Sequence, residues 1–113
     1  MLSKEESLDV SYVEIPARMD SWECWIDNTE PSSLEATLHA ILLKSDFSVL
    51  DTLVHHFPVK GYTAIWLLAE SHLAVHTFPE SQKSYLQISS CNASKLEVFK
   101  ALISASVDLS IIR

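Results

Sequence analysis

The sequence predicts an α+β fold, a two-layer sandwich in which a mostly antiparallel sheet carries two helices on one face. Several segments alternate apolar and polar residues with the period of two that is typical of strands. Two further segments place apolar residues at helical spacing, one after the first strand and one after the last long strand. With 113 residues, of which 48% are hydrophobic and 20% charged, the chain is expected to form one domain over residues 1–113.

The first half of the chain is expected to begin with an irregular segment, followed by one strand and one helix. Residues 1–19 are polar and predict an arm or an edge element. The alternation of SWECWI predicts a strand over 21–26. A helix is expected over 30–46, with Ser32 or Ser33 as its N-cap. The apolar face of this helix would be formed by Leu34, Leu38, Ile41 and Leu42.

The second half is expected to form a run of antiparallel strands and a closing helix. The expected strands cover 47–57, 62–69, 71–78 and 84–91. The segment PVKG predicts the turn after the first of them, and PESQK predicts the hairpin loop between the last two. A second helix would start after its N-cap Asn92, and VDLSIIR could add a short final strand. The apolar positions of this helix are Leu96, Phe99, Leu102 and Ile103.

Composition argues against two classes of partner. The formal net charge of −7 does not favour nucleic acid, since binding to phosphates needs clustered Lys and Arg. The charge would suit a cationic ligand, although an acidic surface also serves solubility alone. No apolar run approaches the roughly 20 residues that cross a bilayer, so no membrane association is expected. The first residues do not have the pattern of a secretory signal, and we therefore expect a cytoplasmic protein.

Common metal-binding and nucleophile patterns are missing from the sequence. Cys24 and Cys91 lie far apart and are expected to stay reduced. His72 and His76 could form half of a metal site, but no further ligand stands at a suitable spacing, so no metal is expected. A serine hydrolase built on Ser71 would want flanking glycines, which are absent there.

Alternation along 71–78 assigns its side chains to two faces of the sheet. One phase, expected to pack against the helices, holds Leu73, Val75 and Thr77; the other holds His72, Ala74, His76 and Phe78. The same reasoning allows His76 and Cys91 to share the exposed face, which is unusual for a face that contacts solvent. Each also has an ordinary explanation, because a lone His is often only hydrogen-bonded and a lone Cys often acts as a small buried apolar residue.

The segment AESHLAVHTFPE, residues 69–80, resembles the self-processing segment of the small prokaryotic S-adenosylmethionine decarboxylases. The motif of that family reads close to ESH-x-x-[IV]-H-T-[WF]-PE. Upstream, HHFPVKGYTAIWLL is similar to the family's H-x-F…G-x-S stretch, and downstream Cys91 lies twenty residues after Ser71, where the family has its catalytic cysteine. The resemblance covers residues 45–92 well and the surrounding order of helices and strands more loosely.

The resemblance implies that the chain makes a cofactor from its own backbone. Ser71 would attack the carbonyl of Glu70, and cleavage would give a β chain of residues 1–70 and an α chain that starts at position 71. The residue left there would become a covalent pyruvoyl group, so that neither pyridoxal phosphate nor a metal is needed. His76 would serve as the base in processing, and the Thr63 hydroxyl as an oxyanion donor.

For the cleaved enzyme, the resemblance implies decarboxylation of S-adenosylmethionine to the aminopropyl donor of spermidine biosynthesis. The pyruvoyl ketone would form a Schiff base with the substrate amine, and Cys91 would return a proton to carbon. Phe57, Phe78 and Glu80 would bind substrate, the two rings at the adenine or the sulfonium and the carboxylate at the ribose. Without the motif, both rings could equally be core aromatics. A homodimer of cleaved αβ protomers is expected.

The chain departs from the family pattern at several positions, which leaves other substrates open. The family's N-terminal G-[RK]-H-[LI] strand start is replaced by MDSWECWI, and Thr63 and Phe78 replace Ser and Trp. Asn92 follows Cys91 where Gly is common. The alternatives are a pyruvoyl-dependent decarboxylase of arginine or ornithine, and a partner subunit without enzymatic activity that never cleaves.

Overall fold

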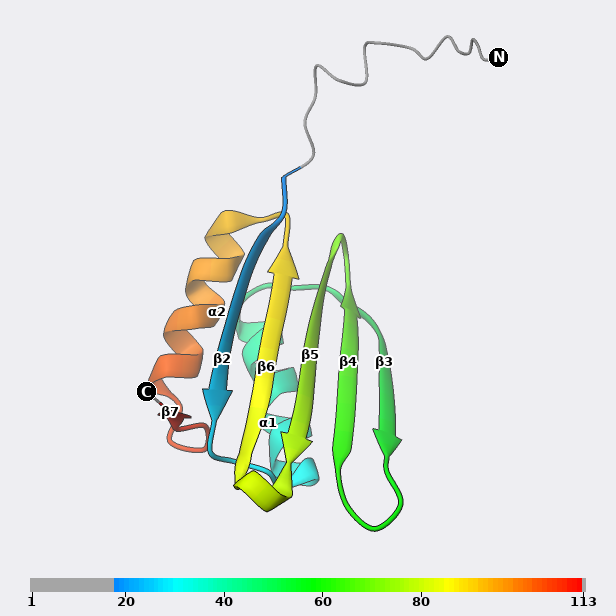
Figure 1. The fold of residues 1–113 in the computed structure, drawn as a ribbon. Helices are drawn as coiled ribbons and strands as arrows, with labels where there is room; N and C mark the ends of the chain where they lie inside the picture. The colour runs from blue at the N-terminus through cyan, green and yellow to red at the C-terminus, as the bar shows by residue number, and fades with distance from the viewer. Residues whose placement is uncertain (1–17, 113) are drawn as a thin grey trace, which may run out of the picture.

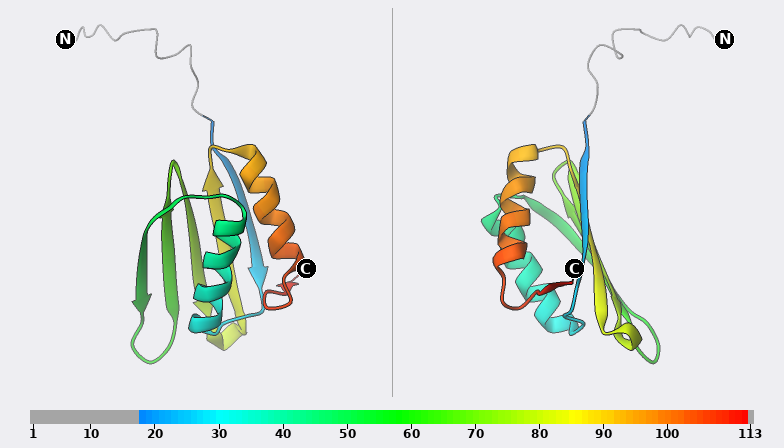
Figure 2. Two further views of the ribbon diagram at one scale, coloured as in Figure 1. Left: turned by 180° about the vertical axis from the view of Figure 1, so that it is seen from behind. Right: turned by 60° about the vertical axis from the view of Figure 1, so that its left-hand side comes forward.

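The structure, a computed structural model, describes residues 18–112, and within them it forms one antiparallel sheet with two helices (Figure 1). The elements in chain order are β2 (Asp20–Ile26), α1 (Pro31–Lys44), β3 (Val49–His56), β4 (Tyr62–Leu68), β5 (Ser71–Phe78), the 3₁₀ turn η2 (Pro79–Ser81), β6 (Lys83–Ser90), α2 (Ala93–Ala105) and β7 (Ile111–Ile112). The strand order across the sheet is β3-β4-β5-β6-β2-β7. Both helices cover the same face (Figure 2). The predicted α+β two-layer fold is therefore confirmed.

The predicted helices and long strands agree with the structure to within two residues at each end, and β7 covers two residues of the expected final segment 107–113. The predicted N-cap of α1 is wrong. Glu30, not Ser32 or Ser33, is the N-cap, and its Oε1 accepts a hydrogen bond of 2.7 Å from the Ser33 backbone N–H. Pro31 explains the difference, because its fixed φ suits the first helical position and it has no N–H to satisfy. The helix therefore begins at Pro31, and the residue before it takes the capping role.

The predicted N-cap of α2, Asn92, is confirmed, since its side chain accepts a hydrogen bond of 3.0 Å from the Lys95 backbone N–H. The arm or edge element expected over 1–19 lies outside the described residues, except for Arg18 and Met19 immediately before β2.

The core lies between the sheet and the two helices. Trp66 and Tyr62 of β4 are almost fully buried there, and Phe99 of α2 contacts Phe47 and Trp22 edge to face, at 6.4 Å between ring centroids in each pair. Of the expected apolar helix positions, Leu102 is partly buried, and the others are buried: Leu34, Leu38, Ile41, Leu42, Leu96, Phe99 and Ile103. Burial of these apolar side chains is the main term that stabilises the fold.

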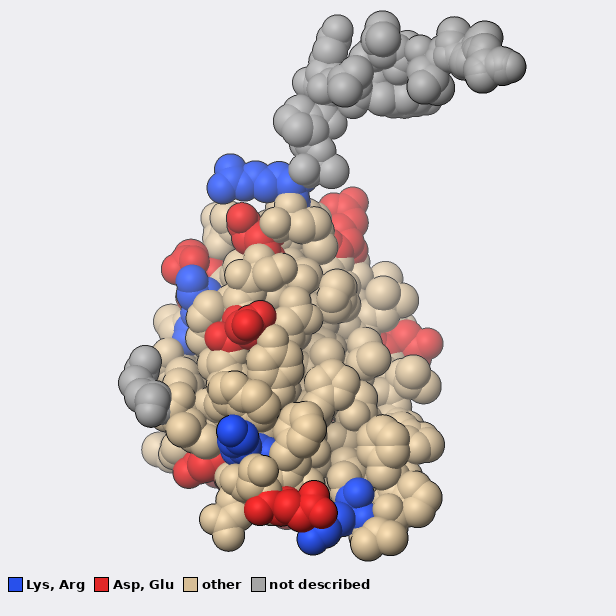
Figure 3. Space-filling view, in the orientation of Figure 1, with Lys and Arg blue, Asp and Glu red and all other residues tan. Residues whose placement is uncertain are grey.

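The opposite side of the sheet, which we call the open face, is not covered by either helix. It carries the side chains that alternate along each strand with those facing the helices. Three of its apolar side chains are well exposed: Leu53 (69%), Leu67 (51%) and Ile65 (36%). Uncharged side chains cover the middle of this face over β5 and β4 (Figure 3). The sheet thus presents an apolar surface on which another molecule could pack.

Candidate active site

The predicted cleavage position lies in the tight turn between β4 and β5. Leu68 and Ser71 are paired, so that only Ala69 and Glu70 connect the two strands. Glu70 has φ of 62°, the left-handed region that Gly and Asn usually occupy. The peptide bond between Glu70 and Ser71 therefore follows directly on an unfavourable backbone conformation.

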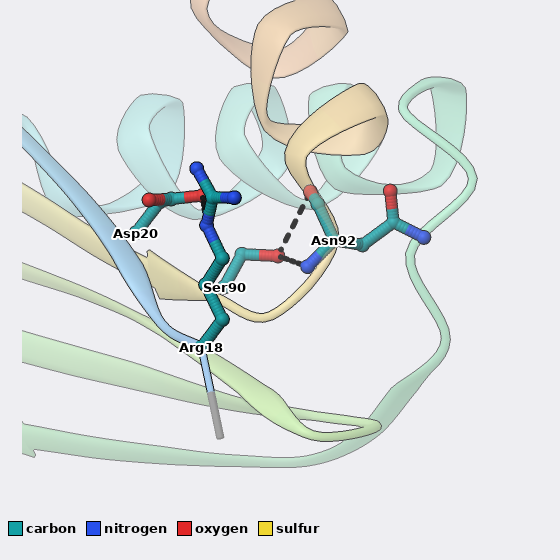
Figure 4. A network of polar contacts seen from close by, with 4 residues as sticks. All are labelled: Arg18, Asp20, Ser90 and Asn92. Carbon is teal, nitrogen blue, oxygen red and sulfur yellow. Dashed lines mark hydrogen bonds and ion pairs between the residues drawn. The ribbon is translucent and has the colours of Figure 1, made fainter. Parts of the chain in front are cut away.

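Ser71 is buried, at 6% exposure, and its hydroxyl is held by β6. Its Oγ donates a hydrogen bond of 3.2 Å to the Oγ of Ser90, the residue opposite it in the β5–β6 pairing. The Ser90 hydroxyl in turn donates to the Asn92 carbonyl at 3.3 Å and accepts from the Asn92 backbone N–H at 3.0 Å (Figure 4). In its contact with Ser90 the Ser71 hydroxyl is the donor, so this hydrogen bond does not occupy the lone pairs of the oxygen that would attack.

Cys91 lies beside the same turn. One further step of the β5–β6 register beyond the Ser71–Ser90 pair brings Cys91 opposite Glu70. The Cys91 thiol donates a hydrogen bond of 3.2 Å to Glu70 Oε1. This contact, together with desolvation and the carboxylate charge, raises the pKa of Cys91, although the Ser71 hydroxyl acts in the opposite direction. Glu70, Ser71, Ser90 and Cys91 together form what we call the cleavage-site cluster.

Thr63 and His76 form a second polar group on the open face. They are directly opposite each other in β4 and β5, with Thr63 Oγ1 3.0 Å from His76 Nδ1. The direction of this hydrogen bond depends on the tautomer of the imidazole. Both residues were expected to act in processing, and the structure shows that their side chains are in contact.

Within one chain, however, His76 is far from the cleavage-site cluster. His76 lies five steps along β5 from Ser71, which at about 3.3 Å per step is about 16 Å, and the odd offset points the two side chains to opposite faces. The expectation that His76 and Cys91 could share the open face does not bring the two side chains together within a single chain. Cys91 lies beyond the end of β6, and the β6 residue opposite His76 is Tyr85.

Phe57, Phe78 and Glu80 lie at the same end of the sheet as His76, away from the cleavage-site cluster. Phe57 is 49% exposed and lines a shallow hollow of about 270 Å³, whereas Phe78 is 45% exposed and contacts Trp25 with 5.7 Å between ring centroids. Glu80 is exposed in η2. Phe78 and Glu80 do not line the hollow at Phe57, so the three predicted substrate residues do not form one pocket within a single chain.

Sequence reasoning missed several residues of both groups. Ser90 and the side chain of Glu70 could have been found from the symmetric hairpin around PESQK, which places residue 71 opposite 90 and residue 70 opposite 91. Next to Phe78, Trp25 contacts the ring of Tyr85 at 5.2 Å and lies under the Lys83 ammonium at 4.3 Å. This cluster depends on the β2–β6 pairing, for which the sequence carries no local signal.

The described residues contain neither a cluster of metal ligands nor a membrane-spanning helix. Between residues 18 and 112, no three His, Cys, Asp or Glu side chains lie close enough together to hold a metal ion. Neither helix in that range is long and apolar enough to span a membrane.

Comparison with known proteins shows the family to which the chain belongs. The family described as S-adenosylmethionine decarboxylase matches residues 18–109 of this chain. The chain belongs to this family. It is 30% identical to the S-adenosylmethionine decarboxylase proenzyme of Parasynechococcus marenigrum (strain WH8102) over 76 residues, which are 67% of this chain and 52% of that protein. It is 32% identical to the proenzyme of Sulfurihydrogenibium sp. (strain YO3AOP1) over 77 residues, or 68% and 56% of the two chains.

The fold of the S-adenosylmethionine decarboxylase family is also found by structural comparison. The crystal structure of the adenosylmethionine decarboxylase from Aquifex aeolicus VF5 superposes with a TM-score of 0.62 and 16% identity, covering 74% of each chain. This similarity concerns the fold alone. The matched segment spans about half the length of the curated relatives, so the roles of individual residues in this family member are argued below from its own geometry.

Proposed function

We propose that this chain cuts itself between Glu70 and Ser71 and then decarboxylates S-adenosylmethionine with a pyruvoyl group made from Ser71. The observation that carries the proposal is the cleavage-site cluster. A buried serine hydroxyl follows the unfavourable turn residue Glu70, and the Cys91 thiol lies next to both. Membership of a family whose relatives are named as proenzymes supports the same reaction.

The proposed cleavage uses only groups of the chain and water. Ser71 Oγ attacks the Glu70 carbonyl carbon, the new C–O bond replaces the C–N bond, and the released amine takes up a proton. Removal of the Cα proton of residue 71 then expels the Glu70 carboxylate, which ends the chain 1–70. The dehydroalanine that remains adds water and loses ammonia, which leaves a ketone at the start of chain 71–113. The hydrogen bond from Ser71 to Ser90 positions the attacking oxygen for the first of these steps.

The residues around position 71 fit the pyruvoyl group that the family uses. When present, the group supplies a carbonyl that binds the substrate amine and accepts the electrons released with CO₂. The Cys91 thiol stands next to position 71 and keeps its proton, because its pKa is raised. We propose that it donates this proton to the substrate carbon after CO₂ has left.

We further propose that the active protein is a homodimer in which each site is completed by the second chain. The Thr63–His76 pair lies on the open face about 16 Å from Ser71, too far to act within its own chain. Packing two open faces together around a two-fold axis would bury Leu53, Leu67 and Ile65 and bring the His76 of one copy toward the cluster of the other. In this arrangement His76 serves as the base for the Cα proton and Thr63 orients its ring.

The proposed substrate class follows from the same geometry. Phe57, Phe78 and Glu80 are exposed at the end of the sheet that carries His76, so they would meet the partner's cleavage-site cluster together with His76. Two aromatic rings suit an adenine base or a sulfonium cation, and a carboxylate suits ribose hydroxyls. We therefore propose S-adenosylmethionine rather than arginine or ornithine as the substrate.

Cleavage is tested by the intact mass of the purified protein. Two fragments, 1–70 and 71–113, are expected, and Ser71→Ala should give one uncut chain. A single full-length wild-type mass would refute the proposed cleavage and favour the partner subunit that never cleaves. Release of CO₂ from S-adenosylmethionine, arginine and ornithine, compared side by side, then tests the substrate. Faster release from either amino acid would refute the nucleoside substrate.

The shared site is tested by co-expressing Ser71→Ala with His76→Ala chains that carry different tags. Neither variant should cleave alone. In the mixed dimer one site has both wild-type residues, so about half of the His76→Ala chains should be cut when the two mix at random. No cleavage in the mixture would show that the two residues do not act across the interface.

A further inference from the structure

The side chain of Glu70 has no part in the proposed cleavage, which uses only its backbone carbonyl. Its presence is not explained by the turn either. With φ of 62°, the position would favour Gly or Asn, since the β-carbon of other residues crowds the backbone there. A glutamate at this position therefore calls for a different explanation, and its contacts supply one.

The Glu70 carboxylate accepts the hydrogen of the Cys91 thiol at 3.2 Å. Both residues are exposed, so the contact is not forced by burial of either side chain. It follows instead from the backbone, because Glu70 and Cys91 lie one step beyond Ser71–Ser90, the end pair of the β5–β6 register. The left-handed conformation of Glu70 belongs to the two-residue turn between β4 and β5, directly before the strand that pairs with β6.

Other charged side chains near this end of the sheet have different partners. The Asp20 carboxylate, on β2, is 3.7 Å from the Arg18 guanidinium (Figure 4). The Lys95 ammonium, on the first turn of α2, lies over the Phe47 ring at 5.9 Å. Among the described residues, Glu70 is the charged group that acts on the Cys91 thiol.

We propose that Glu70 is a positioning residue for Cys91: its carboxylate keeps the thiol hydrogen on sulfur and holds it next to position 71. The proposal rests on the proposed function, in which Cys91 donates that hydrogen to carbon. A thiolate could not donate a proton, and it would also be the form that alkylating and oxidising agents attack. Cleavage leaves the Glu70 side chain in place as the last residue of chain 1–70, so the contact can serve both the uncut and the cut protein.

The test measures the rate at which iodoacetamide alkylates Cys91 as a function of pH. A Cys24→Ser, Ser71→Ala background leaves one cysteine and one uncut chain. Glu70→Gln, which keeps the shape and removes the charge, should shift the profile to lower pH and speed alkylation several-fold at neutral pH. If the glutamine variant folds poorly, Glu70→Gly takes its place, because glycine suits the backbone conformation of the turn, and it should shift the alkylation profile in the same direction. Glu97→Gln, which removes an exposed carboxylate of α2, should leave the profile unchanged.

An unchanged profile in both Glu70 variants would overturn the proposal. An equal shift in Glu97→Gln would overturn it as well, since the effect would then be one of net charge alone. In protein with Ser71 intact, Glu70→Gln should also lower kcat for decarboxylation while KM is kept. If wild-type protein releases no CO₂ although the alkylation profiles differ as expected, the proposed function fails while the contact between Glu70 and Cys91 stands.

Discussion

Replacing Ser90 by Ala separates the positioning of Ser71 from the stability of the fold. Ser90 is fully buried on β6, accepts the hydrogen bond of Ser71 and binds both backbone groups of Asn92. Asn92 is the N-cap of α2. We therefore expect Ser90→Ala both to slow cleavage and to destabilise the protein, and the two effects can be measured independently.

The size of each effect follows from the contacts that are lost. The Asn92 N–H loses its partner in a partly buried hydrogen bond, which costs about 0.5–1.5 kcal/mol of unfolding free energy. For a domain of this size, that lowers Tm by roughly 4–8 °C per kcal/mol. Loss of a neutral hydrogen bond of about 0.5–1.5 kcal/mol that positions Ser71 Oγ should slow cleavage by roughly 2- to 12-fold.

Ser84 provides the matched control. It is also a fully buried serine of β6, and its hydroxyl donates a hydrogen bond of 2.7 Å to the Asn28 carbonyl, far from the cleavage-site cluster. Ser84→Ala should lower Tm by a comparable amount and leave the cleavage rate unchanged. The assay follows the uncut fraction by intact mass after synthesis, alongside thermal unfolding of each variant. Equal slowing by both variants would refute a positioning role for Ser90 and leave only a stability effect.

Three further perturbations test other parts of the structure. Cys91→Ala should still cleave but should release CO₂ at least about 100-fold more slowly, and an unaffected rate would exclude it as the proton donor. Leu53→Lys should convert the dimer to monomers, as measured by light scattering, since each of the two symmetric copies loses about 1.5 kcal/mol or more of apolar burial at the interface. Thr52→Lys, on the other face of β3, should leave the dimer intact. The Tyr62 hydroxyl donates a hydrogen bond of 2.8 Å to Glu35 Oε1, and the pKa of Tyr62 is raised, first by burial and then by this contact. Tyr62→Phe should therefore lower the free energy of unfolding by about 1 kcal/mol, measured by urea denaturation at pH 7. Because the folded pKa is raised, this stabilisation is complete below the ordinary pKa of about 10 and should shrink at pH 11, and a constant difference between the two proteins would contradict it.

The sequence was sufficient for the order of elements and for the face on which each strand residue lies. The alternation of Leu73, Val75 and Thr77 with His72 and His76 has its origin in the pleat of the backbone, which turns successive side chains to opposite faces whatever the surrounding structure. The same pattern already placed Ser71 and His76 in opposite phases. A single-chain site containing both was therefore in conflict with the strand that the sequence predicted.

Contacts between elements were less accessible from the sequence. The N-cap of α1 was predicted from serines of high capping preference, but the local effect of Pro31 shifted the start of the helix to the residue after Glu30. The cluster of Trp25, Phe78 and Tyr85 depends on which strand lies beside β6, and that neighbour, β2, is far away in the sequence.

The sequence by itself determined that this is a two-layer α+β protein carrying the motif of a self-cleaving decarboxylase, since periodicity and motif are both local properties. The tertiary structure was needed to show that the Ser71 hydroxyl donates to Ser90. It also decided that the Glu70 carboxylate meets the Cys91 thiol. Both results depend on hairpin register and turn conformation, which are fixed by packing of the whole sheet against its helices rather than by any short stretch of residues.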